Sequence, residues 1–554
     1  MIPYRRNLLP TECPCGFRVL QGKGYWLDDA VKCSRCALST SRSEGLRGRV
    51  QATYGPDAWT VSDYQASGAG FLAARWSALL SDRMGLGKTA QALLAVPERA
   101  PVAIVCPAGV KSVWEREIAL WRPEYRTRVL SGRGSWDPPE ANEVVILNYA
   151  ILPALRAPCL TCEHNEKDHT QSAGCKVGPC PCPRFEGHLP PKEVAAEELG
   201  VNPGTVLIPD EIHKAKNLAS TQTRRLRYLV RACERVFGLS ASPIMNHPRE
   251  LRAIYKVLEV YEVAFPHGDR EFKRLTEFYD EAERAGKAIT TEFVARRGRV
   301  ELGRTAEEVG LELPPLRFET RRVSITAESR ALIEEALSRA LAKRRAMREV
   351  ESGVCKPEDV EERVRLLMLV SHTDEEVQEL LDAVVENKEW DEIAGELAAL
   401  RKALALAKIP AALAFADEVR DAGEPLVAFS SHVAPVEALA GRKGWGNLRK
   451  ASRRKQTIED FQAGKLAGVA GTIRGSSEGI TLTRARFFLF VDQDWTPEAN
   501  IQALKRIHRR GQLRACLVVL LMADHPVDVY VQEANKRKLN MIEDLSNKKP
   551  VTAQ

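Results

Sequence analysis

The chain has 554 residues, enough for roughly three or four domains. An apolar content of 44% and a charged content of 28% fit a globular protein, and no apolar stretch approaches a membrane span or a secretory leader, so we expect a cytoplasmic protein. The net charge of +7 permits a nucleic-acid partner without requiring one, and the lean, Arg- and Ala-rich composition indicates a compact bacterial or phage protein.

Two pairs of cysteines define the first segment, residues 1–48. Cys13 and Cys15 form a Cys-x-Cys pair, and Cys33 and Cys36 form a Cys-x₂-Cys pair. Four thiolates suit tetrahedral Zn²⁺, and the residues between the pairs can form two short hairpins. We therefore predict a zinc-ribbon-like segment, with free or redox-active cysteines as the alternative.

Residues 49–260 alternate short apolar runs with helical patterns, which is typical of a parallel sheet covered by helices. Polar, motif-like residues follow several of these runs, and ligands of open α/β sheets bind beyond the carboxyl ends of the strands. The runs that we expect to form strands are 76–80, 102–105, 144–147, 206–208 and 236–239.

A glycine-rich turn, Asp82 to Thr89, lies between the first of these runs and a helix. Its glycines let backbone N–H groups close around phosphate oxygens, and the helix N-terminus adds partial positive charge. Lys88 is expected to reach the β- and γ-phosphates of a nucleoside triphosphate, and Thr89 to offer its hydroxyl to Mg²⁺. Asp82 stands where the strict pattern has glycine, so the loop taken alone also fits an ordinary glycine turn.

A Cys- and His-rich insert, residues 156–190, interrupts this α/β block. The candidate ligands exceed one tetrahedral site, so one zinc with spare ligands and two zincs are both consistent with the pattern. Contact with DNA or a partner and a purely structural, metal-dependent knob remain open for the insert. The predicted zinc ligands are Cys159, Cys162, His164, His169, Cys175, Cys180 and Cys182.

Two adjacent carboxylates, Asp210 and Glu211, follow the run at 206–208. At a strand end, one carboxylate can hold Mg²⁺ while the other orients and deprotonates the attacking water. We assign Asp210 to the metal and Glu211 to the base. An ordinary acidic exit from a strand is the alternative, and the upstream glycine loop favours the catalytic interpretation.

Strand signals vanish between 261 and 395, where charged segments with apolar residues at helical spacing predict a helical connector. Residues 396–554 return to α/β patterning. There, Arg506 and Arg509 are three apart on a predicted helix and share a face, and guanidinium groups aimed at a γ-phosphate stabilise transition-state charge. A basic solvated helix is the alternative. The expected strands of this block are 426–429, 487–491 and 517–521.

With these residues in order, the chain resembles the Swi/Snf-type ATPases, double-stranded DNA translocases of helicase superfamily two. Asp82 to Thr89 resembles the family's Asp-Glu-Met-Gly-Leu-Gly-Lys-Thr, so the missing first glycine is a family trait. Departures such as Arg83, Ile212 and Thr496 remove no catalytic group. The resemblance covers about 60 to 535 and rests on Tyr64-Gln65, Cys106-Pro107-Ala108, Leu147-Asn148-Tyr149, Asp210 to Asn217, Leu239 to Pro243, Leu311 to Pro315, Phe429 to Ser431, Gly475 to Leu482, Asp492 to Pro497, and Arg506 with Arg509.

The resemblance implies two RecA-like parallel-sheet lobes, 49–260 and 396–554, that close on ATP and Mg²⁺. It implies that the catalytic residues are Lys88, Asp210, Glu211, Arg506 and Arg509. The residues that it implies for nucleotide binding are Gln65, Met84, Gly85, Leu86, Gly87, Lys88, Thr89, Ala90, Asp210, Gly479 and Gln502.

The leading hypothesis is ATP-driven movement along double-stranded DNA, independent of sequence, that remodels protein–DNA or branched DNA structures. For the basic segment 442–455, two interpretations stay open: it flanks the DNA path, or it forms a solvated loop. The alternatives are a strand-separating DNA or RNA helicase and a zinc-dependent DNA-binding scaffold with an inactive motor. Candidates for contact with the DNA backbone are Lys111, Ser112, Asn148, Tyr149, Ser476, Ser477 and Trp495.

Overall fold

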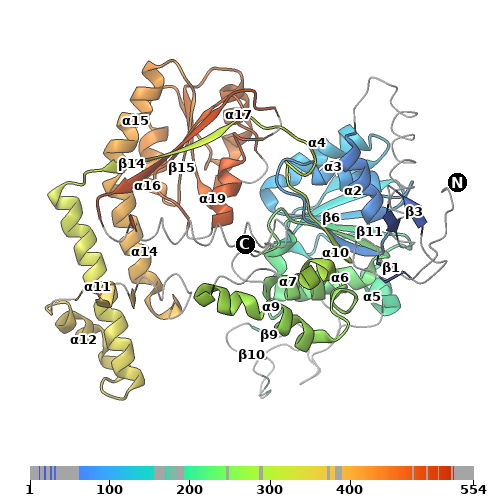
Figure 1. Ribbon diagram of the computed structural model, residues 1–554, viewed down its shortest axis with the longest axis horizontal. Helices are drawn as coiled ribbons and strands as arrows, with labels where there is room; N and C mark the ends of the chain where they lie inside the picture. Colours follow the sequence, from blue (N-terminus) through green and yellow to red (C-terminus); the bar gives the residue numbers. More distant parts are fainter. Residues whose placement is uncertain are drawn as a thin grey trace. The chain divides into compact units, whose positions relative to one another are not determined.

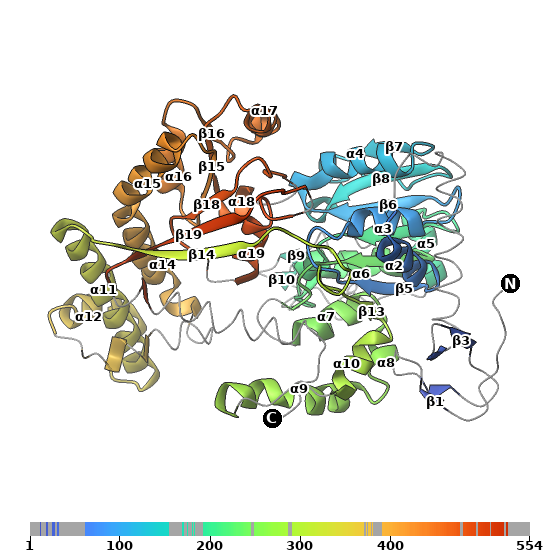
Figure 2. The same cartoon turned by 45° about the horizontal axis from the view of Figure 1, so that its top comes forward.

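The computed structural model divides the chain into two compact units, which we call lobe 1 (residues 1–312 with 542–554) and lobe 2 (residues 313–541). Figures 1 and 2 draw both lobes. The structure describes residues 61–154, 180, 182, 192–244, 249–285, 291–370, 373, 375–377, 379–380, 390–476, 480–494, 497–509, 511–525 and 528–529, and the backbone of a few short strands elsewhere.

Lobe 1 is built on a seven-stranded sheet of order β13-β5-β12-β11-β6-β8-β7, in which all neighbouring strands are parallel. In β6, Ala103 and Val105 enter one hydrophobic cluster while Val102 and Ile104 enter another. Successive side chains of a strand point to opposite faces, so both faces of this sheet are buried. The strands are β5 (Ser77–Leu80), β6 (Val102–Cys106), β7 (Arg126–Val129), β8 (Glu143–Asn148), β11 (Val206–Pro209), β12 (Arg235–Leu239) and β13 (Glu301–Leu302).

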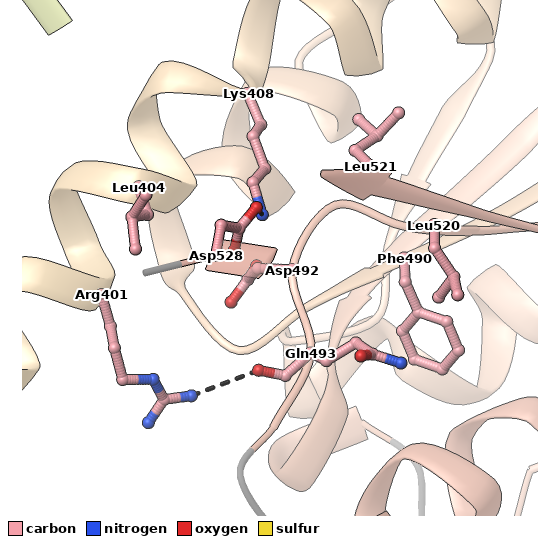
Figure 3. A pocket seen from close by; sticks show the side chains of 9 residues that line it. All are labelled: Arg401, Leu404, Lys408, Phe490, Asp492, Gln493, Leu520, Leu521 and Asp528. Atoms are coloured by element: carbon pink, nitrogen blue, oxygen red, sulfur yellow. Dashed lines mark hydrogen bonds and ion pairs between the residues drawn. The ribbon is translucent and has the colours of Figure 1, made fainter. Parts of the chain in front are cut away.

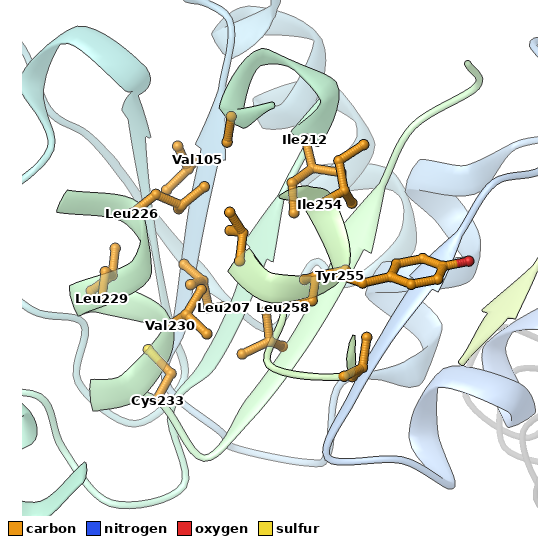
Figure 4. Close-up of a cluster of buried hydrophobic side chains, with 14 of the residues drawn as sticks. Val105, Leu207, Ile212, Leu226, Leu229, Val230, Cys233, Ile254, Tyr255 and Leu258 are labelled. Carbon is orange, nitrogen blue, oxygen red and sulfur yellow. The ribbon is translucent and has the colours of Figure 1, made fainter. Parts of the chain in front are cut away.

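Helices cover each face of this sheet. One cluster contains residues of α2 (Asp63–Ala73), α3 (Lys88–Ala95) and α4 (Lys111–Trp121). The opposite cluster contains residues of α5 (Lys192–Leu199), α6 (Thr221–Ala232) and α7 (Arg249–Val257), and Figure 4 shows its apolar side chains meeting between these helices and the strands. Both faces of lobe 1 are therefore closed by amphipathic helices, leaving the strand ends for polar residues.

Three further helices extend lobe 1 before its last strand: α8 (Tyr261–Ala264), α9 (Gly268–Ala285) and α10 (Thr291–Gly298). Phe265 is fully buried at their centre, with ring contacts to Tyr255, Phe272 and Phe293. This aromatic cluster fixes the helices that lead the chain back to the sheet at β13.

Lobe 2 is built on a six-stranded parallel sheet of order β14-β19-β18-β15-β17-β16. Its two faces are buried in the same alternating way: Val427 and Phe429 of β15 enter one cluster, and Leu426 and Ala428 enter the other. The strands are β14 (Leu316–Val323), β15 (Leu426–Ser430), β16 (Trp445–Asn447), β17 (Gly468–Thr472), β18 (Phe487–Phe490) and β19 (Cys516–Ala523).

Two groups of helices belong to lobe 2. The long helix α11 (Ala327–Glu351) shares one apolar cluster with α14 (Trp390–Ala407) and another with α12 (Val360–Leu367). α15 (Ile409–Asp421) leads into β15, and the helices that follow individual strands of the sheet are α16 (Val433–Ala440), α17 (Ala451–Gln462), α18 (Ile473–Ser476) and α19 (Pro497–Leu504). Both lobes thus have the α/β class that the sequence predicts, two parallel sheets with helices on their faces.

All the apolar runs that were predicted to be strands are strands. The absence of strands between 261 and 395 was a wrong expectation. β13 adds to lobe 1 and β14 adds to lobe 2 within that range, and both are edge strands of their sheets. Edge strands are half exposed and carry charged residues, as Leu316 to Val323 does with three arginines and a glutamate, so their apolar periodicity is weak.

Short antiparallel pairs lie in the two cysteine-rich segments. β1 (Thr11–Glu12) pairs with β2 (Arg18–Val19), on either side of the first cysteine pair. β3 (Tyr25–Leu27) pairs with β4 (Ala30–Lys32), between the two cysteine pairs, where two hairpins were predicted. In the insert, β9 (His169–Thr170) pairs with β10 (Gly174–Cys175). Among the described residues, no helix has the length and apolar character needed to cross a membrane.

Candidate functional site

The predicted phosphate loop connects β5 to α3, and its glycines take conformations that other residues rarely adopt. Gly85 and Gly87 have φ angles of 88° and 70°, in the left-handed region. A Cβ atom at Gly87 would lie 2.4 Å from Nε2 of Gln65, so this position also needs glycine for space. Leu86 and Ala90 are buried, whereas Met84, Gly85, Gly87, Lys88 and Thr89 are partly exposed.

Gln65, which the resemblance implies contacts adenine, therefore lies against the phosphate loop. It is buried in the first turn of α2, where its Oε1 accepts the backbone N–H of Ser62 at 3.1 Å. Its Nε2 points to Gly87. This capping arrangement fixes the glutamine amide beside the loop.

Lys88 is held at the base of the loop. Its Nζ donates to the backbone carbonyl of Asp82 at 2.7 Å. Burial lowers the pKa of Lys88, and the negative charges of Glu211, Asp82 and Asp210 act in the opposite direction. The ammonium group is thus close to both carboxylates that follow β11, and phosphate oxygens can replace the carbonyl as its acceptor.

Asp210 follows the last residue of β11 and is oriented by three contacts. Its Oδ2 accepts the indole N–H of Trp114 at 3.0 Å, and its Oδ1 accepts the backbone N–H of Glu211 at 3.0 Å. Its own carbonyl accepts the hydroxyl of Tyr149 at 2.7 Å. Burial and the charge of Glu211 raise the pKa of Asp210 to about 7, so a cation near this carboxylate would strongly favour its ionised form.

Glu211 adopts a left-handed backbone conformation, with φ at 53°. For a residue with a Cβ this costs about 1–2 kcal/mol, and such strain concentrates at functional sites. Its Oε2 lies 3.3 Å from Nδ1 of His213, which in turn lies 3.0 Å from the hydroxyl of Ser240. The same hydroxyl accepts the backbone N–H of Ser242 at 3.2 Å, so the ends of β11 and β12 are linked through His213 and Ser240.

The strand order explains why these residues meet. β5, β12, β11 and β6 are consecutive neighbours in a parallel sheet, so their carboxyl ends lie along one edge. The backbone continues this alignment past the strands, since Asp210 N donates to Val105 O at 2.8 Å and Ser240 N donates to Leu80 O at 3.2 Å. The phosphate loop, the paired carboxylates and the Ser240 turn therefore share the position where ligands of open α/β sheets bind.

The predicted arginines of lobe 2 contact the same carbonyl, but they are not on a helix. α19 ends at Leu504, and residues 505–509 form turns. The guanidinium groups of Arg506 and Arg509 both donate to the carbonyl of Ile480, at 3.5 and 3.4 Å. Arg506 is buried and Arg509 is partly exposed.

The helix stops there because the following residues are fixed from outside it. The backbone N–H groups of Arg506 and Ile507 donate to carbonyls three residues earlier, instead of the four of an α-helix. The ring of His508 forms a hydrogen bond with the carbonyl of Pro314 at 2.8 Å. The side-chain amide of Gln512 donates to Thr483 O, Ala485 O and Ile507 O at 3.0, 2.8 and 3.1 Å. Both arginines are thereby tied to the segment 480–485. Gln502 is partly exposed on α19, and Gly479 lies outside the described residues.

A buried polar cluster connects the strand ends of lobe 2. Asp492 accepts backbone N–H of Ser431 at 3.2 Å and bonds Nδ1 of His432 at 2.9 Å, besides a short contact with Ser430. Figure 3 shows Asp492 facing a small cavity, where Lys408 points to Asp528 with 2.6 Å between Nζ and Oδ2 and Arg401 reaches the carbonyl of Gln493. The cluster joins the segment after β15 to the segment after β18.

Two of the expected DNA contacts are engaged elsewhere in lobe 1. Tyr149 is buried, and its hydroxyl is committed to Asp210. Lys111 donates to the carbonyl of Leu130 at 2.7 Å, and burial lowers its pKa. The hydroxyl of Tyr149 thus supports the candidate site, and contact of either residue with DNA stays a prediction. Ser477 and Trp495 lie outside the described residues.

The basic segment 442–455 divides into paired and exposed cations. Arg449 pairs with Glu437 at 2.7 Å, Arg442 pairs with Asp417, and Arg454 donates to the carbonyls of Leu448 and Gly475. The exposed cations are Lys443, Lys450, Arg453 and Lys455.

The predicted zinc ligands lie mostly where the structure gives no description. This holds for Cys13, Cys15, Cys33, Cys36, Cys159, Cys162 and His164, and for the side chains of His169 and Cys175. Cys182 is buried and Cys180 is partly buried against the apolar cluster of lobe 1. Within the described ranges, no group of three or more His, Cys, Asp or Glu side chains is arranged to hold a metal ion.

Sequence reasoning missed one residue of the site, Arg304. Its guanidinium bonds both carboxylate oxygens of Asp82, at 2.9 and 2.6 Å. The only local signal is a lone arginine far along the chain, so nothing in a sequence window could identify it. Asp82, which replaces the usual glycine of the loop pattern, is thereby explained as the acceptor of a buried ion pair.

Comparison with known proteins identifies the family. Residues 64–378 match the SNF2-related domain, and residues 396–511 match the helicase conserved C-terminal domain. The chain belongs to the SNF2-related family of helicase superfamily two. These two domains make it a Swi/Snf-type ATPase by family, a helicase-like hydrolase, as the resemblance implied.

The chain is also similar to longer curated proteins. It is 23% identical over 501 residues to the SWI/SNF-related matrix-associated actin-dependent regulator of chromatin subfamily A-like protein 1 of Xenopus tropicalis, covering 86% of this chain and 44% of that protein. It is 23% identical to Protein CHROMATIN REMODELING 19 of Arabidopsis thaliana, covering 86% and 68%. The chain spans less than half the length of the first of these relatives.

A structural similarity is found to the Sulfolobus solfataricus SWI2/SNF2 ATPase core in complex with dsDNA, with a TM-score of 0.36, 18% identity, and coverage of 88% of this chain and 93% of that one. The curated relatives named above come from a frog and a plant, so a bacterial or phage source stays a prediction from composition.

Proposed function

We propose that this chain hydrolyses ATP when bound to double-stranded DNA and uses the energy to move along the duplex and remodel protein–DNA or branched DNA structures. The observation that carries the proposal is the meeting of Lys88, Asp210 and Glu211 at one edge of the lobe 1 sheet. Family membership supports the same reaction class.

The chemistry follows from the positions of these groups. A water oxygen attacks the γ-phosphorus, the bond to the β,γ-bridging oxygen breaks, and ADP leaves with the electron pair. Glu211 accepts the proton of the water, and Lys88 leaves the carbonyl of Asp82 for the β- and γ-phosphate oxygens. The oriented carboxylate of Asp210 and the hydroxyl of Thr89 fit a hard cation, and Mg²⁺ held there would neutralise phosphate charge.

Arg506 and Arg509 complete the proposal from lobe 2. Because both donate to the carbonyl of Ile480, their two guanidinium groups lie side by side. Guanidinium groups stabilise the charge that develops on the transferred phosphoryl group, so we propose that hydrolysis is fastest when lobe 2 brings them to the nucleotide.

Duplex DNA is the proposed track. The Met84-Gly85-Leu86-Gly87 loop and the Asp492-Gln493-Asp494-Trp495 segment resemble those of duplex translocases rather than strand-separating helicases. The exposed cations Lys443, Lys450, Arg453 and Lys455 suit the phosphate backbone, which is bound without regard to sequence. A strand-separating helicase and an inactive DNA-binding scaffold are the competing functions.

Structural zinc is a second proposal, supported by the spacing of the cysteines and by the hairpins at 11–19 and 25–32. Metal analysis of purified protein should find about one zinc per chain or more. A metal content well below that would overturn the proposal for both segments.

The main proposal is tested by ATP hydrolysis in the presence of duplex, single-stranded and forked DNA, with Lys88→Ala as the matched variant. We expect strong stimulation by duplex in the wild type and near-background turnover in the variant. Stimulation by single strands alone would favour the strand-separating helicase. No hydrolysis with any nucleic acid would favour the scaffold, and unchanged turnover in Lys88→Ala would overturn the site.

A further inference from the structure

A buried ion pair fixes the start of the phosphate loop. Asp82 is fully buried, and Arg304 donates to both of its carboxylate oxygens, from Nε at 2.9 Å and from Nη2 at 2.6 Å. Two parallel N–H···O bonds fix orientation as well as distance. The carbonyl of the same Asp82 accepts Lys88, so the residue that Arg304 orients is also the residue on which the predicted phosphate-binding lysine rests.

Gln91 extends this cluster to the rest of the loop. Its Oε1 accepts Nη2 of Arg304 at 2.8 Å, and its Nε2 donates to Oδ2 of Asp82 at 3.0 Å and to the carbonyl of Leu86 at 3.0 Å. Leu86 lies between the two loop glycines. The amide of Gln91 therefore links Arg304 to the middle of the loop through hydrogen bonds.

Arg304 also contacts the helix that carries Gln65. Its Nη1 donates to the carbonyl of Tyr64 at 2.7 Å, and its guanidinium carbon lies 5.5 Å from the centroid of the Tyr64 ring. Gln65 is the next residue and lies against Gly87. One guanidinium thus connects the element expected to contact adenine with the loop expected to hold the phosphates.

The backbone around Arg304 is also fixed, and the cluster is closely packed against α2. The carbonyl of Arg304 accepts the N–H of Arg83 at 2.9 Å, which continues the pairing of β13 with β5 into the loop. A Cβ atom at Gly68 would lie 1.8 Å from Oε1 of Gln91 and 2.7 Å from Nη2 of Arg304. Glycine at position 68 of α2 is therefore required by the cluster, although alanine is the better helix former.

We infer that Arg304 is a positioning residue for nucleotide binding: it sets the phosphate loop relative to α2, so that phosphates and adenine are bound in one geometry. The inference rests on the proposed ATP site. It goes beyond that site because Arg304 bonds Asp82, Gln91 and Tyr64 rather than the groups expected to contact the phosphates. Its removal is expected to weaken ATP and ADP binding while Asp210 and Glu211, which it does not contact, stay in place.

The test is equilibrium binding of fluorescent ATP and ADP to the full chain carrying Arg304→Gln or Arg304→Lys, with duplex affinity and thermal unfolding measured in parallel. Arg304→Gln should bind both nucleotides at least tenfold more weakly and raise KM for ATP, with kcat at saturating ATP changed far less. Arg304→Lys should recover part of the affinity, since one ammonium cannot reach all the acceptors that the guanidinium reaches.

Arg252→Gln is the matched control. Arg252 makes a pair of the same two-bond geometry with Asp269, at 2.7 and 2.5 Å, but this pair is exposed. It belongs to the same lobe and shares no hydrogen-bond partner with the phosphate loop. Arg252→Gln should leave nucleotide affinity unchanged. If Arg304→Gln fails to fold, Gly68→Ala displaces the same cluster without leaving a buried charge, and it too should weaken nucleotide binding.

Nucleotide affinity equal to wild type in Arg304→Gln or Gly68→Ala would overturn the inference, as would a loss of duplex affinity in proportion to the loss of nucleotide affinity. A wild-type chain that binds neither nucleotide would overturn the proposed function itself, and the inference with it.

Discussion

The indole N–H of Trp114 donates to Oδ2 of Asp210 at 3.0 Å, joining α4 to the residue that follows β11. Trp114 is fully buried, so its ring cannot turn away without opening the core. An outer partner of this kind orients a metal-binding carboxylate, and losing one typically costs 10- to 100-fold in metal affinity. The relationship makes a large aromatic residue part of the proposed Mg²⁺ site.

Trp114→Phe should keep most of the packing and remove this hydrogen bond. We expect the Mg²⁺ concentration for half-maximal ATP hydrolysis to rise roughly tenfold. Trp121→Phe is the control, because Trp121 lies on the same helix and donates its indole N–H to Glu117 at 3.0 Å, outside the site. Equal Mg²⁺ dependence in the two variants would contradict the role given to Trp114.

Ser240→Ala should separate hydrolysis from movement. The hydroxyl of Ser240 lies 3.0 Å from Nδ1 of His213 and links the segment after β11 to the segment after β12. Without it, we expect duplex-stimulated hydrolysis to stay within about threefold of wild type, the loss of a single neutral hydrogen bond. Displacement of a third strand from duplex DNA per ATP hydrolysed should fall much more. A parallel decline of both activities would exclude a coupling role.

Arg506→Gln and Arg509→Gln should each lower kcat, by roughly 10³-fold where the arginine contacts the transferred phosphoryl group. ATP affinity should change far less, because lobe 1 holds the proposed phosphate-binding loop. Arg514→Gln, which removes an exposed pair with Glu424, serves as the control in rapid-quench measurements. Wild-type kcat in both variants would remove the arginines from the mechanism.

The stability of lobe 2 should depend on pH through Asp492. Burial acts to raise its pKa, but the hydrogen bond and charge of His432, with Ser430 and Lys408, outweigh burial and hold the pKa below its usual value. A carboxylate with a depressed folded-state pKa contributes stability above the unfolded value of about 3.9, and that contribution is lost as the pH falls further.

The protection of β15 and β18 peptides against hydrogen exchange, measured relative to the intrinsic exchange rate, should therefore fall as the pH drops from about 5 to 3. In Asp492→Asn this pH-dependent loss of protection should disappear, while protection at neutral pH is already reduced. An unchanged pH profile in the variant would show that other carboxylates dominate.

The strands that sequence patterns identified are those buried on both faces. Runs such as Val102 to Val105 and Phe487 to Phe490 are continuous apolar stretches because helices cover each side of the sheet. β7, β13 and β14 were not predicted because they are edge strands with charged residues, and β17 because Gly468 to Thr472 is rich in small residues. Apolar periodicity thus reports the middle of a sheet better than its rim.

The site was predictable where its residues are adjacent in sequence. The loop at 82–89 and the pair Asp210 and Glu211 carry local patterns, and the strand order brings them together as expected. The helix expected under Arg506 and Arg509 was wrong because distant contacts, those of Gln512 and His508, end it at Leu504. Arg304 was not identified at all, since its only signal is a three-dimensional contact.

The position of Arg304 also governs how the protein can be divided or synthesised. It follows Asp82 by 222 residues. During synthesis the phosphate loop leaves the ribosome long before Arg304 does. Asp82 can therefore form its ion pair only after residue 304 has emerged. A recombinant fragment cut at residue 260 would contain the loop and both carboxylates yet leave a fully enclosed negative charge uncompensated, at a cost of about 3–5 kcal/mol. Fragments meant to stand alone should end no earlier than residue 312.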